Sequence, residues 1–279
     1  MYNSRMVTVR NEDFDIEKIA DSGQCFRLNR CGDHWLNIAG DRVLRIYECG
    51  ESDGVKSYKL DCSKKDFDAF WAPYFDLGCD YSAYRAAVPK KDKFLTAAAS
   101  YGRGIRILRQ DPWEMLITFI ISQRKNIPAI KAGVEALCRN YGVCLPLLSS
   151  MEEMYAFPSV YSLARATESK LKECGLGYRV PYIISAARAV ESGEIDLDAM
   201  AALPDDELLC ELMKIYGVGI KVANCVSLFA YHRINAFPID VWIARVLEEK
   251  YNGCFDASRY EGFKGVIQQY MFYYIRNNH

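Results

Sequence analysis

The pattern of apolar and polar positions divides the chain into two kinds of segment. Between about residues 24 and 60, short runs suited to strands are separated by turns rich in Gly and Asp. The runs are Cys25–Leu28, Trp35–Ile38 and Val43–Tyr47. After Asp66 the apolar residues recur at helical spacing as far as the C-terminus. Strands grouped before helices predict an α+β fold, with an antiparallel β-rich N-terminal domain over residues 1–90 and an all-helical domain over residues 91–279.

The starts of four helices can be predicted from capping residues and prolines. Asp111 is an N-cap residue in front of a proline at the first helical position, and Leu116 and Ile120 then fall on one face. Asn126 is placed to cap a second helix that ends at Gly142. We expect the third and fourth helices to begin at Pro181 and Pro204.

Composition indicates a globular protein and gives no direct sign of a polyanionic partner. The chain has 279 residues, of which 51% are hydrophobic and 25% charged, with a formal net charge of −1. Any affinity for nucleic acid must therefore come from a local surface. The start of the chain lacks the features of a signal peptide, and no apolar stretch has the length of about 20 residues that a membrane span needs. These features favour a cytoplasmic protein, associated with the nucleoid if it is bacterial.

The cysteines do not suggest a disulfide framework or a metal centre. The chain has 11 Cys scattered along its length and only 3 His, without a C-x2-C spacing. We expect free thiols in a reducing compartment, no metal and no cofactor. A protein of this kind is expected to be a monomer.

The segment around residues 205–231 predicts a helix-hairpin-helix. Gly217 and Gly219 stand between two helical patterns and allow a tight turn with positive φ, which leaves backbone amides open to an anion. Turn formation alone is the alternative use of these glycines. Lys221 follows in the first turn of the second helix, where the helix dipole disfavours a cation. That position and partial burial favour a neutral, nucleophilic amine. The alternative is a lysine that contacts phosphate.

A carboxylate follows the hairpin. Pro238 sets an extended entry, and Asp240 stands where an N-cap is expected, so capping is one role for this residue. Ile243 at the third helical position excludes a capping box. A carboxylate near an amine can also stabilise the positive charge on a sugar as its base departs.

Five segments in order along the chain resemble the 8-oxoguanine DNA glycosylase/lyase branch of the helix-hairpin-helix (HhH-GPD) DNA glycosylase superfamily. They are Ser22–Arg27, Gly104–Pro112, Phe119–Ser122, Gly175–Arg179, and the hairpin Gly217–Lys221 with the later Pro238–Asp240. The resemblance implies a partner, double-stranded DNA that contains oxidised guanine, and no cofactor. It also implies that the damaged nucleotide is flipped out of the duplex, because no side chain reaches C1′ inside the stack.

The resemblance assigns roles to individual residues. Lys221 is implied to attack the anomeric carbon and to form a Schiff base that undergoes β-elimination, while Asp240 is implied to stabilise the sugar cation. The substrate-binding residues it implies are Gly23, whose carbonyl would accept the N7 proton of the oxidised purine, and Cys225, Gln268 and Phe272 around the base. Tyr178 and Arg179 match the wedge and the cation that reads the orphaned cytosine. The remaining expected DNA contacts are Arg124, Asn126, Gly217 and Gly219.

The chain departs from the family pattern at two places. Eukaryotic members have an asparagine and a second arginine after the position of Ser122, where this chain has Arg124 and Ala129. We therefore expect a relaxed preference for the base opposite the lesion. A histidine expected shortly after the aspartate is replaced by Trp242.

Other activities of the same fold remain open at this point. An endonuclease-III-like enzyme for oxidised pyrimidines would usually carry a cysteine cluster near the C-terminus, where this chain has only Cys254. An alkylated-base glycosylase would use the aspartate without the hairpin lysine. The last alternative is a helix-hairpin-helix module that binds DNA without catalysis.

Overall fold

The computed structural model describes residues 6–145 and 153–278, which form two compact units. The first unit comprises residues 6–37, 44–109 and 232–278, and the second comprises residues 110–231 together with the turn at 38–43. The units are built from separate stretches of chain. The predicted domain boundary near residue 90 follows the order of strands and helices along the sequence, and it stays a prediction.

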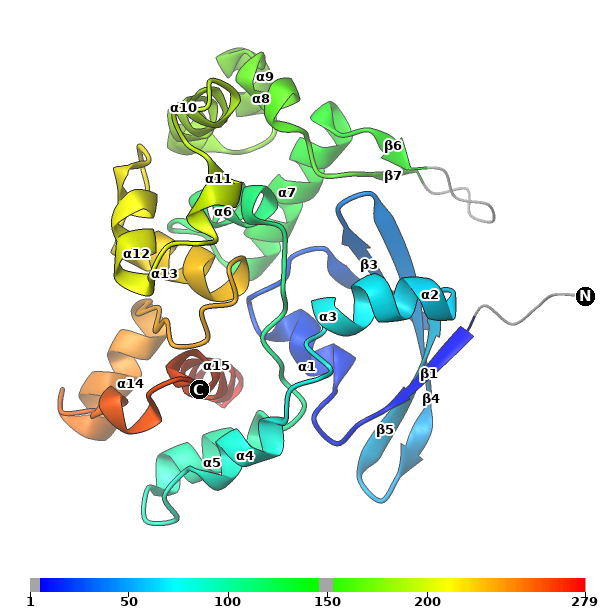
Figure 1. Ribbon diagram of the computed structural model, residues 1–279, viewed down its shortest axis with the longest axis vertical. Helices are drawn as coiled ribbons and strands as arrows, with labels where there is room; N and C mark the ends of the chain where they lie inside the picture. The colour runs from blue at the N-terminus through cyan, green and yellow to red at the C-terminus, as the bar shows by residue number, and fades with distance from the viewer. Residues whose placement is uncertain (1–5, 146–152, 279) are drawn as a thin grey trace, which may run out of the picture. The chain divides into compact units, whose positions relative to one another are not determined.

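A five-stranded sheet confirms the predicted antiparallel meander (Figure 1). Its order is β1-β5-β4-β3-β2, with strands β1 Met6–Arg10, β2 Leu28–Cys31, β3 His34–Ala39, β4 Arg42–Ser52 and β5 Val55–Asp61. β1 pairs antiparallel with β5, so that Met6 lies opposite Asp61. In β4, Leu44 and Ile46 are buried while their neighbours are partly exposed, which is the alternation expected of a sheet with one covered face.

The expectation of a strand at Cys25–Leu28 is wrong for most of that segment, because the strand begins only at Leu28. The side chain of Gln24 explains the difference. Its Nε2 donates to the Arg106 carbonyl at 2.8 Å, and its Oε1 accepts from the Leu108 amide at 2.9 Å. The segment is thus joined to residues 106–108 through a side chain. The sequence pattern did not predict β1, which forms one edge of the sheet.

The remaining elements of the first unit are helices. They are α1 Ile16–Asp21, α2 Lys64–Asp66, the π-helical turn Phe67–Trp71, α3 Ala72–Tyr74, α4 Tyr81–Ala86, α5 Lys93–Tyr101, α14 Val241–Tyr251, the 3-10 turn Ala257–Tyr260 and α15 Lys264–Asn277. α15 packs against both α5 and α14. The side chain of Arg106 is fully buried in this unit and donates to the carbonyls of Asp13 and Phe75, at 3.0 and 3.1 Å.

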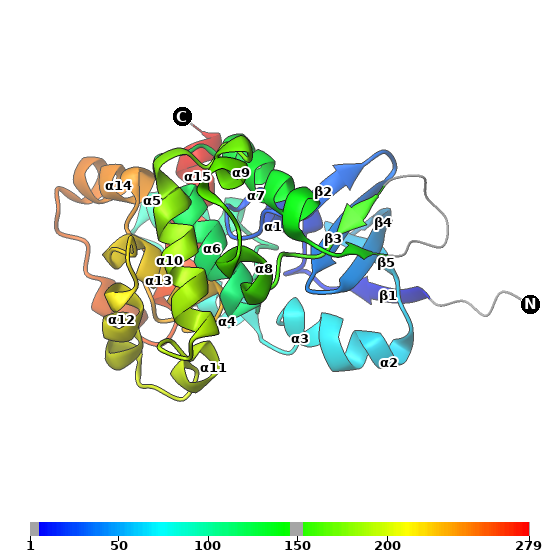
Figure 2. The same cartoon turned by 90° about the horizontal axis from the view of Figure 1, so that it is seen from above.

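The second unit is mainly helical (Figure 2). Its elements are α6 Pro112–Ser122, α7 Ile127–Tyr141, β6 Cys144–Leu145, β7 Met154–Tyr155, α8 Val160–Ala164, α9 Glu168–Glu173, the 3-10 turn Gly177–Arg179, α10 Val180–Glu191, α11 Leu197–Met200, α12 Asp205–Lys214 and α13 Ile220–Phe229. The predicted caps are confirmed where they were expected: Asp111 accepts from the Glu114 amide at 2.8 Å, and Asn126 from the Ala129 amide at 3.0 Å. α6 is buried along almost its whole length and packs against α7, α10 and α13.

Candidate active site

The hairpin between α12 and α13 is a tight turn in which the two glycines differ. Gly217 has φ +86°, as expected, and a Cβ placed there would lie 2.3 Å from Cγ of Tyr182. Gly219 has φ −96° and ψ 176°, so the expectation of positive φ is wrong for this residue. It is the N-cap of α13, and the extended backbone of an N-cap is open to any residue. Among the residues that the structure describes, a Cβ at Gly219 would meet nothing within 4 Å, and no side chain caps α13, so open space lies before the helix N-terminus.

The amine of Lys221 is held against the end of α6. Its Nζ lies 3.5 Å from Oγ of Ser122 and 5.3 Å from the ring centroid of Phe119. The Ser122 hydroxyl donates to the Phe119 carbonyl at 2.7 Å, so its oxygen accepts from the amine. Lys221 is half-buried, with an aromatic face on one side and a hydroxyl on the other. The lysine is therefore not a freely solvated surface group.

The predicted wedge segment, Tyr178–Arg179, has one exposed and one buried side chain. Tyr178 is 49% exposed, whereas Arg179 is only 5% exposed, and its guanidinium lies 4.4 Å from the Tyr178 ring centroid. Arg179 donates to the Leu176 carbonyl at 3.2 Å and to the Gln123 carbonyl. These two bonds use two of the five N–H donors of the guanidinium.

The segment after α6 presents Arg124 to solvent. Arg124 is exposed and has φ +53°, a conformation that few residues with a side chain adopt. The predicted DNA contact Asn126 uses its side-chain oxygen to cap α7. Cys225 is buried within α13.

Asp240 caps α14, as the sequence indicated. Its Oδ1 accepts from the amides of Trp242 and Ile243 at 3.0 and 2.9 Å. Two backbone donors at a helix N-terminus are a suitable setting for a negative charge. Asp240 belongs to the first unit and Lys221 to the second.

The predicted base-reading residues of the first unit lie on α15 and after α1. Gln268 is buried; its Nε2 donates to the Pro238 carbonyl at 3.0 Å, and its Oε1 accepts from Gln269 at 3.0 Å. Phe272 is half-buried in a stretch whose aromatic neighbours Tyr270 and Tyr273 are buried. Tyr274 is half-buried as well, and the Arg276 guanidinium lies 5.6 Å from the ring centroid of Phe272. Gly23 follows the C-cap of α1 with φ +74°.

Three residues that the sequence analysis left without a role contact the hairpin or its lysine. Ser122 and Phe119 face the amine of Lys221. Gln123 donates from Nε2 to the Gly217 carbonyl at 3.0 Å. The only sequence signal for them is their place in or beside the resembling segment Phe119–Ser122.

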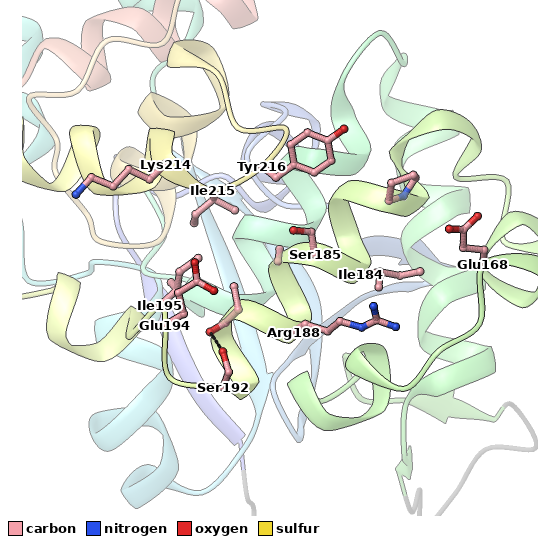
Figure 3. Close-up of a pocket in the computed structure, with 13 residues that line it drawn as sticks. Glu168, Ile184, Ser185, Arg188, Ser192, Glu194, Ile195, Lys214, Ile215 and Tyr216 are labelled. Atoms are coloured by element: carbon pink, nitrogen blue, oxygen red, sulfur yellow. Dashed lines mark hydrogen bonds between the residues drawn. The ribbon is translucent and has the colours of Figure 1, made fainter.

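A groove lies beside the hairpin (Figure 3). It has a volume of about 580 Å³, and its lining includes Ile184, Ser185 and Arg188 of α10 together with Lys214, Ile215 and Tyr216. Both acidic and basic side chains line it, including Glu168 and Glu194. Because the lining carries charges of both signs, it does not favour a ligand of one particular charge.

Two further properties concern metals and membranes. Within residues 6–145 and 153–278, no three His, Cys, Asp or Glu side chains gather in a way that could hold a metal ion. Among the helices in the same ranges, none is long and apolar enough to cross a membrane.

Comparison with known proteins places this geometry in a family. The model for the N-terminal domain of 8-oxoguanine DNA glycosylase matches residues 6–116, and the model for HhH-GPD superfamily base excision DNA repair proteins matches residues 117–253. N-glycosylase/DNA lyase of Saccharomyces cerevisiae is 33% identical over 225 residues, which are 75% of this chain and 54% of the yeast protein. The chain thus spans about half the length of that curated relative.

Two solved structures are similar over nearly their whole length. A structure of MBOgg1 in complex with a low-affinity DNA ligand has 36% identity and a TM-score of 0.90, covering 99% of this chain and 97% of that chain. The 8-oxoguanine glycosylase/lyase of Clostridium acetobutylicum, in complex with double-stranded DNA containing cytosine opposite 8-oxoguanine, has 33% identity and a TM-score of 0.89, with the same coverage. The chain therefore belongs to the 8-oxoguanine DNA glycosylase family of the helix-hairpin-helix (HhH-GPD) superfamily.

Proposed function

We propose that this protein is a bifunctional DNA glycosylase and lyase that excises 8-oxoguanine from duplex DNA in base excision repair. The observation that carries the proposal is the placement of the Lys221 amine against Ser122 and Phe119, in a chain of this family. An aromatic wall and a single hydroxyl hold the amine at the end of α6, where it is placed to attack the flipped nucleotide.

The proposed reaction begins with extrusion of the damaged nucleotide. Lys221 forms a bond to C1′ as the bond from C1′ to the base breaks, and the amine gives up a proton as the base leaves with one. The C1′–O4′ bond then breaks, O4′ takes up a proton, and the opened sugar is held as a Schiff base. This Schiff base loses a C2′ proton as the C3′–O bond breaks and the 3′ phosphate leaves. Asp240 supplies negative charge for the sugar cation that develops during departure of the base. Its binding to two amides holds the carboxylate in a fixed orientation, so that little reorganisation is needed during the reaction.

Gly23, Cys225, Gln268 and Phe272 are the proposed surroundings of the flipped base. Gly23, with φ +74°, is proposed to accept the N7 proton of the lesion through its carbonyl. The half-buried Phe272 can offer a ring face, and Gln268 offers an amide held at both ends. An undamaged guanine would leave the carbonyl facing a lone pair, a loss of about 1–3 kcal/mol.

We also propose that the preference for the opposite base is relaxed. Arg179 is engaged with backbone carbonyls, and Ala129 stands where eukaryotic members have an arginine. Arg124 is exposed and can contact the phosphate backbone, which carries no sequence information directly. Single-turnover excision opposite C, A, G and T tests this. One lost charged hydrogen bond is worth about 1.5–3 kcal/mol, so the preference for C should be weaker than that of a eukaryotic member by roughly 10- to 160-fold. A preference for C as steep as that of a eukaryotic member would refute it.

Borohydride trapping tests the activity itself. A duplex containing 8-oxoguanine should give a covalent adduct with the wild-type protein, because borohydride reduces the Schiff base to a stable amine. Lys221→Gln should lose the adduct. Lys214→Gln is the matched control, since Lys214 ends the preceding helix, its side chain is 69% exposed, and its amine pairs with Glu211 on the same helix. Cleavage that survives Lys221→Gln undiminished would defeat the proposed role.

The expectations of a monomer in the cytoplasm, associated with the nucleoid if the source is bacterial, are part of the proposal. Light scattering of the protein alone and bound to one duplex measures the oligomeric state. A mass of two chains on one lesion would contradict it.

A further inference from the structure

Gln123 lies at a junction of three segments of the second unit. It is the C-cap of α6 and directly follows Ser122, whose hydroxyl faces the Lys221 amine. Its Nε2 donates to the Gly217 carbonyl at 3.0 Å, while its own carbonyl accepts from the Arg179 guanidinium. One residue thus joins the wedge segment to the hairpin.

Tyr182 makes a second connection between the same two segments. Its ring lies against Gly217 so closely that a Cβ on this glycine would clash. The ring also packs edge-on against Tyr178, with centroids 6.1 Å apart, and against Tyr216 at 4.9 Å. Both connections meet at Gly217, one short turn before Lys221. The hairpin is therefore held from the side of the wedge as well as from α6.

We propose that Gln123 is a positioning residue that couples the wedge segment Tyr178–Arg179 to the hairpin that carries Lys221. This inference rests on the function proposed above. When Tyr178 occupies the space left by the flipped nucleotide, its position is passed through Arg179 and Gln123 to the Gly217 carbonyl. The amine of Lys221 is then aligned with C1′ only while the wedge is seated. Small displacements of a reacting group have large effects on rate, so a bond at this distance from the chemistry can matter.

Two substitutions separate the hydrogen bond from the bulk of the side chain. Gln123→Ala removes the donor, and Gln123→Glu keeps the size but presents an acceptor to the Gly217 carbonyl. We expect single-turnover excision at saturating enzyme to fall about tenfold in Gln123→Ala, the effect of one hydrogen bond, and at least as far in Gln123→Glu. Affinity for the lesion duplex, measured with Gln123→Ala, should stay within about twofold of wild type, because Gln123 is placed to orient the hairpin.

The matched control is Asn140→Ala, which also removes a side-chain donor to a backbone carbonyl, that of Ala136 at 2.8 Å on α7. It should excise at the wild-type rate. Combining Gln123→Ala with Tyr178→Ala tests the coupling: the double variant should lose less than the product of the two single losses.

The outcomes distinguish this inference from the function on which it rests. A wild-type protein that excises 8-oxoguanine, with Gln123→Ala equally fast, overturns the inference alone, as do losses that multiply fully in the double variant. A Gln123→Glu variant that keeps the wild-type rate overturns it too, because bulk alone would then suffice. A wild-type protein that neither excises nor forms an adduct overturns the proposed function and the inference with it.

Discussion

Replacing Gly217 with alanine should destabilise the protein through two separate effects. The first is backbone strain: at φ +86° an L side chain costs roughly 1–2 kcal/mol. The second is steric, because the new Cβ would lie 2.3 Å from Cγ and 2.8 Å from Cβ of Tyr182. Those atoms belong to the stiff base of the side chain, so Tyr182 must shift, at a typical cost of about 1–3 kcal/mol. The sum is about 2–5 kcal/mol.

Gly175 provides a control that isolates the second effect. It has φ +71°, and a Cβ there would meet no atom of the described part of the chain within 4 Å. Gly175→Ala should therefore be destabilised by backbone strain alone, by about 1–2 kcal/mol. Both variants restrict the unfolded chain equally, so that contribution cancels in the comparison.

Urea unfolding followed by linear extrapolation measures the free energy of unfolding of both variants. Gly217→Ala should be less stable than Gly175→Ala by about 1–3 kcal/mol, the cost of displacing Tyr182. Equal stability of the two would refute the argument that Tyr182 fixes the hairpin. Excision should also slow more in Gly217→Ala, since the displaced glycine carries the carbonyl that Gln123 holds.

Three further predictions concern other parts of the molecule. Gly219→Ala should weaken lesion-duplex binding in a titration while costing less than about 1 kcal/mol of stability, since the added methyl enters open space before α13; unchanged binding would contradict this. Burial opposes ionisation of Asp76, but bonds from His232 and Arg109 outweigh it and lower its pKa below the ordinary 3.8. The ionised Asp76 therefore contributes to the free energy of unfolding above pH 3.8, and this contribution is lost as the pH falls below that value. In Asp76→Asn, the free energy of unfolding should depend less steeply on pH below 3.8 than in the wild type. An unchanged pH dependence would count against this role. Burial raises the pKa of the Cys62 thiol to about 11, so iodoacetamide at pH 8 should label it far more slowly than the exposed cysteines, and equal rates would disprove the shielding.

Local sequence determined the helix starts and the grouping of strands before helices. Asp111 and Asn126 are capping residues whose bonds reach only three residues along the chain, so their role could be deduced from neighbours in sequence. Asp240 was identified as a cap for the same reason. The hairpin lysine and the family were recognised because the motif residues lie close together in sequence, with several such segments in a fixed order.

The tertiary structure alone decided which residues hold these motifs in place. Gln123 and Gly217 are 94 residues apart, and Arg179 and Gln123 are 56 apart, so no local pattern could pair them. The same is true of Gln24, whose side chain turns an expected strand into an irregular segment by bonding to Leu108, 84 residues away. Gly219 shows another limit of the sequence. A glycine can be needed for a positive φ or for the space that a side chain would fill, and only the folded backbone shows which of the two applies.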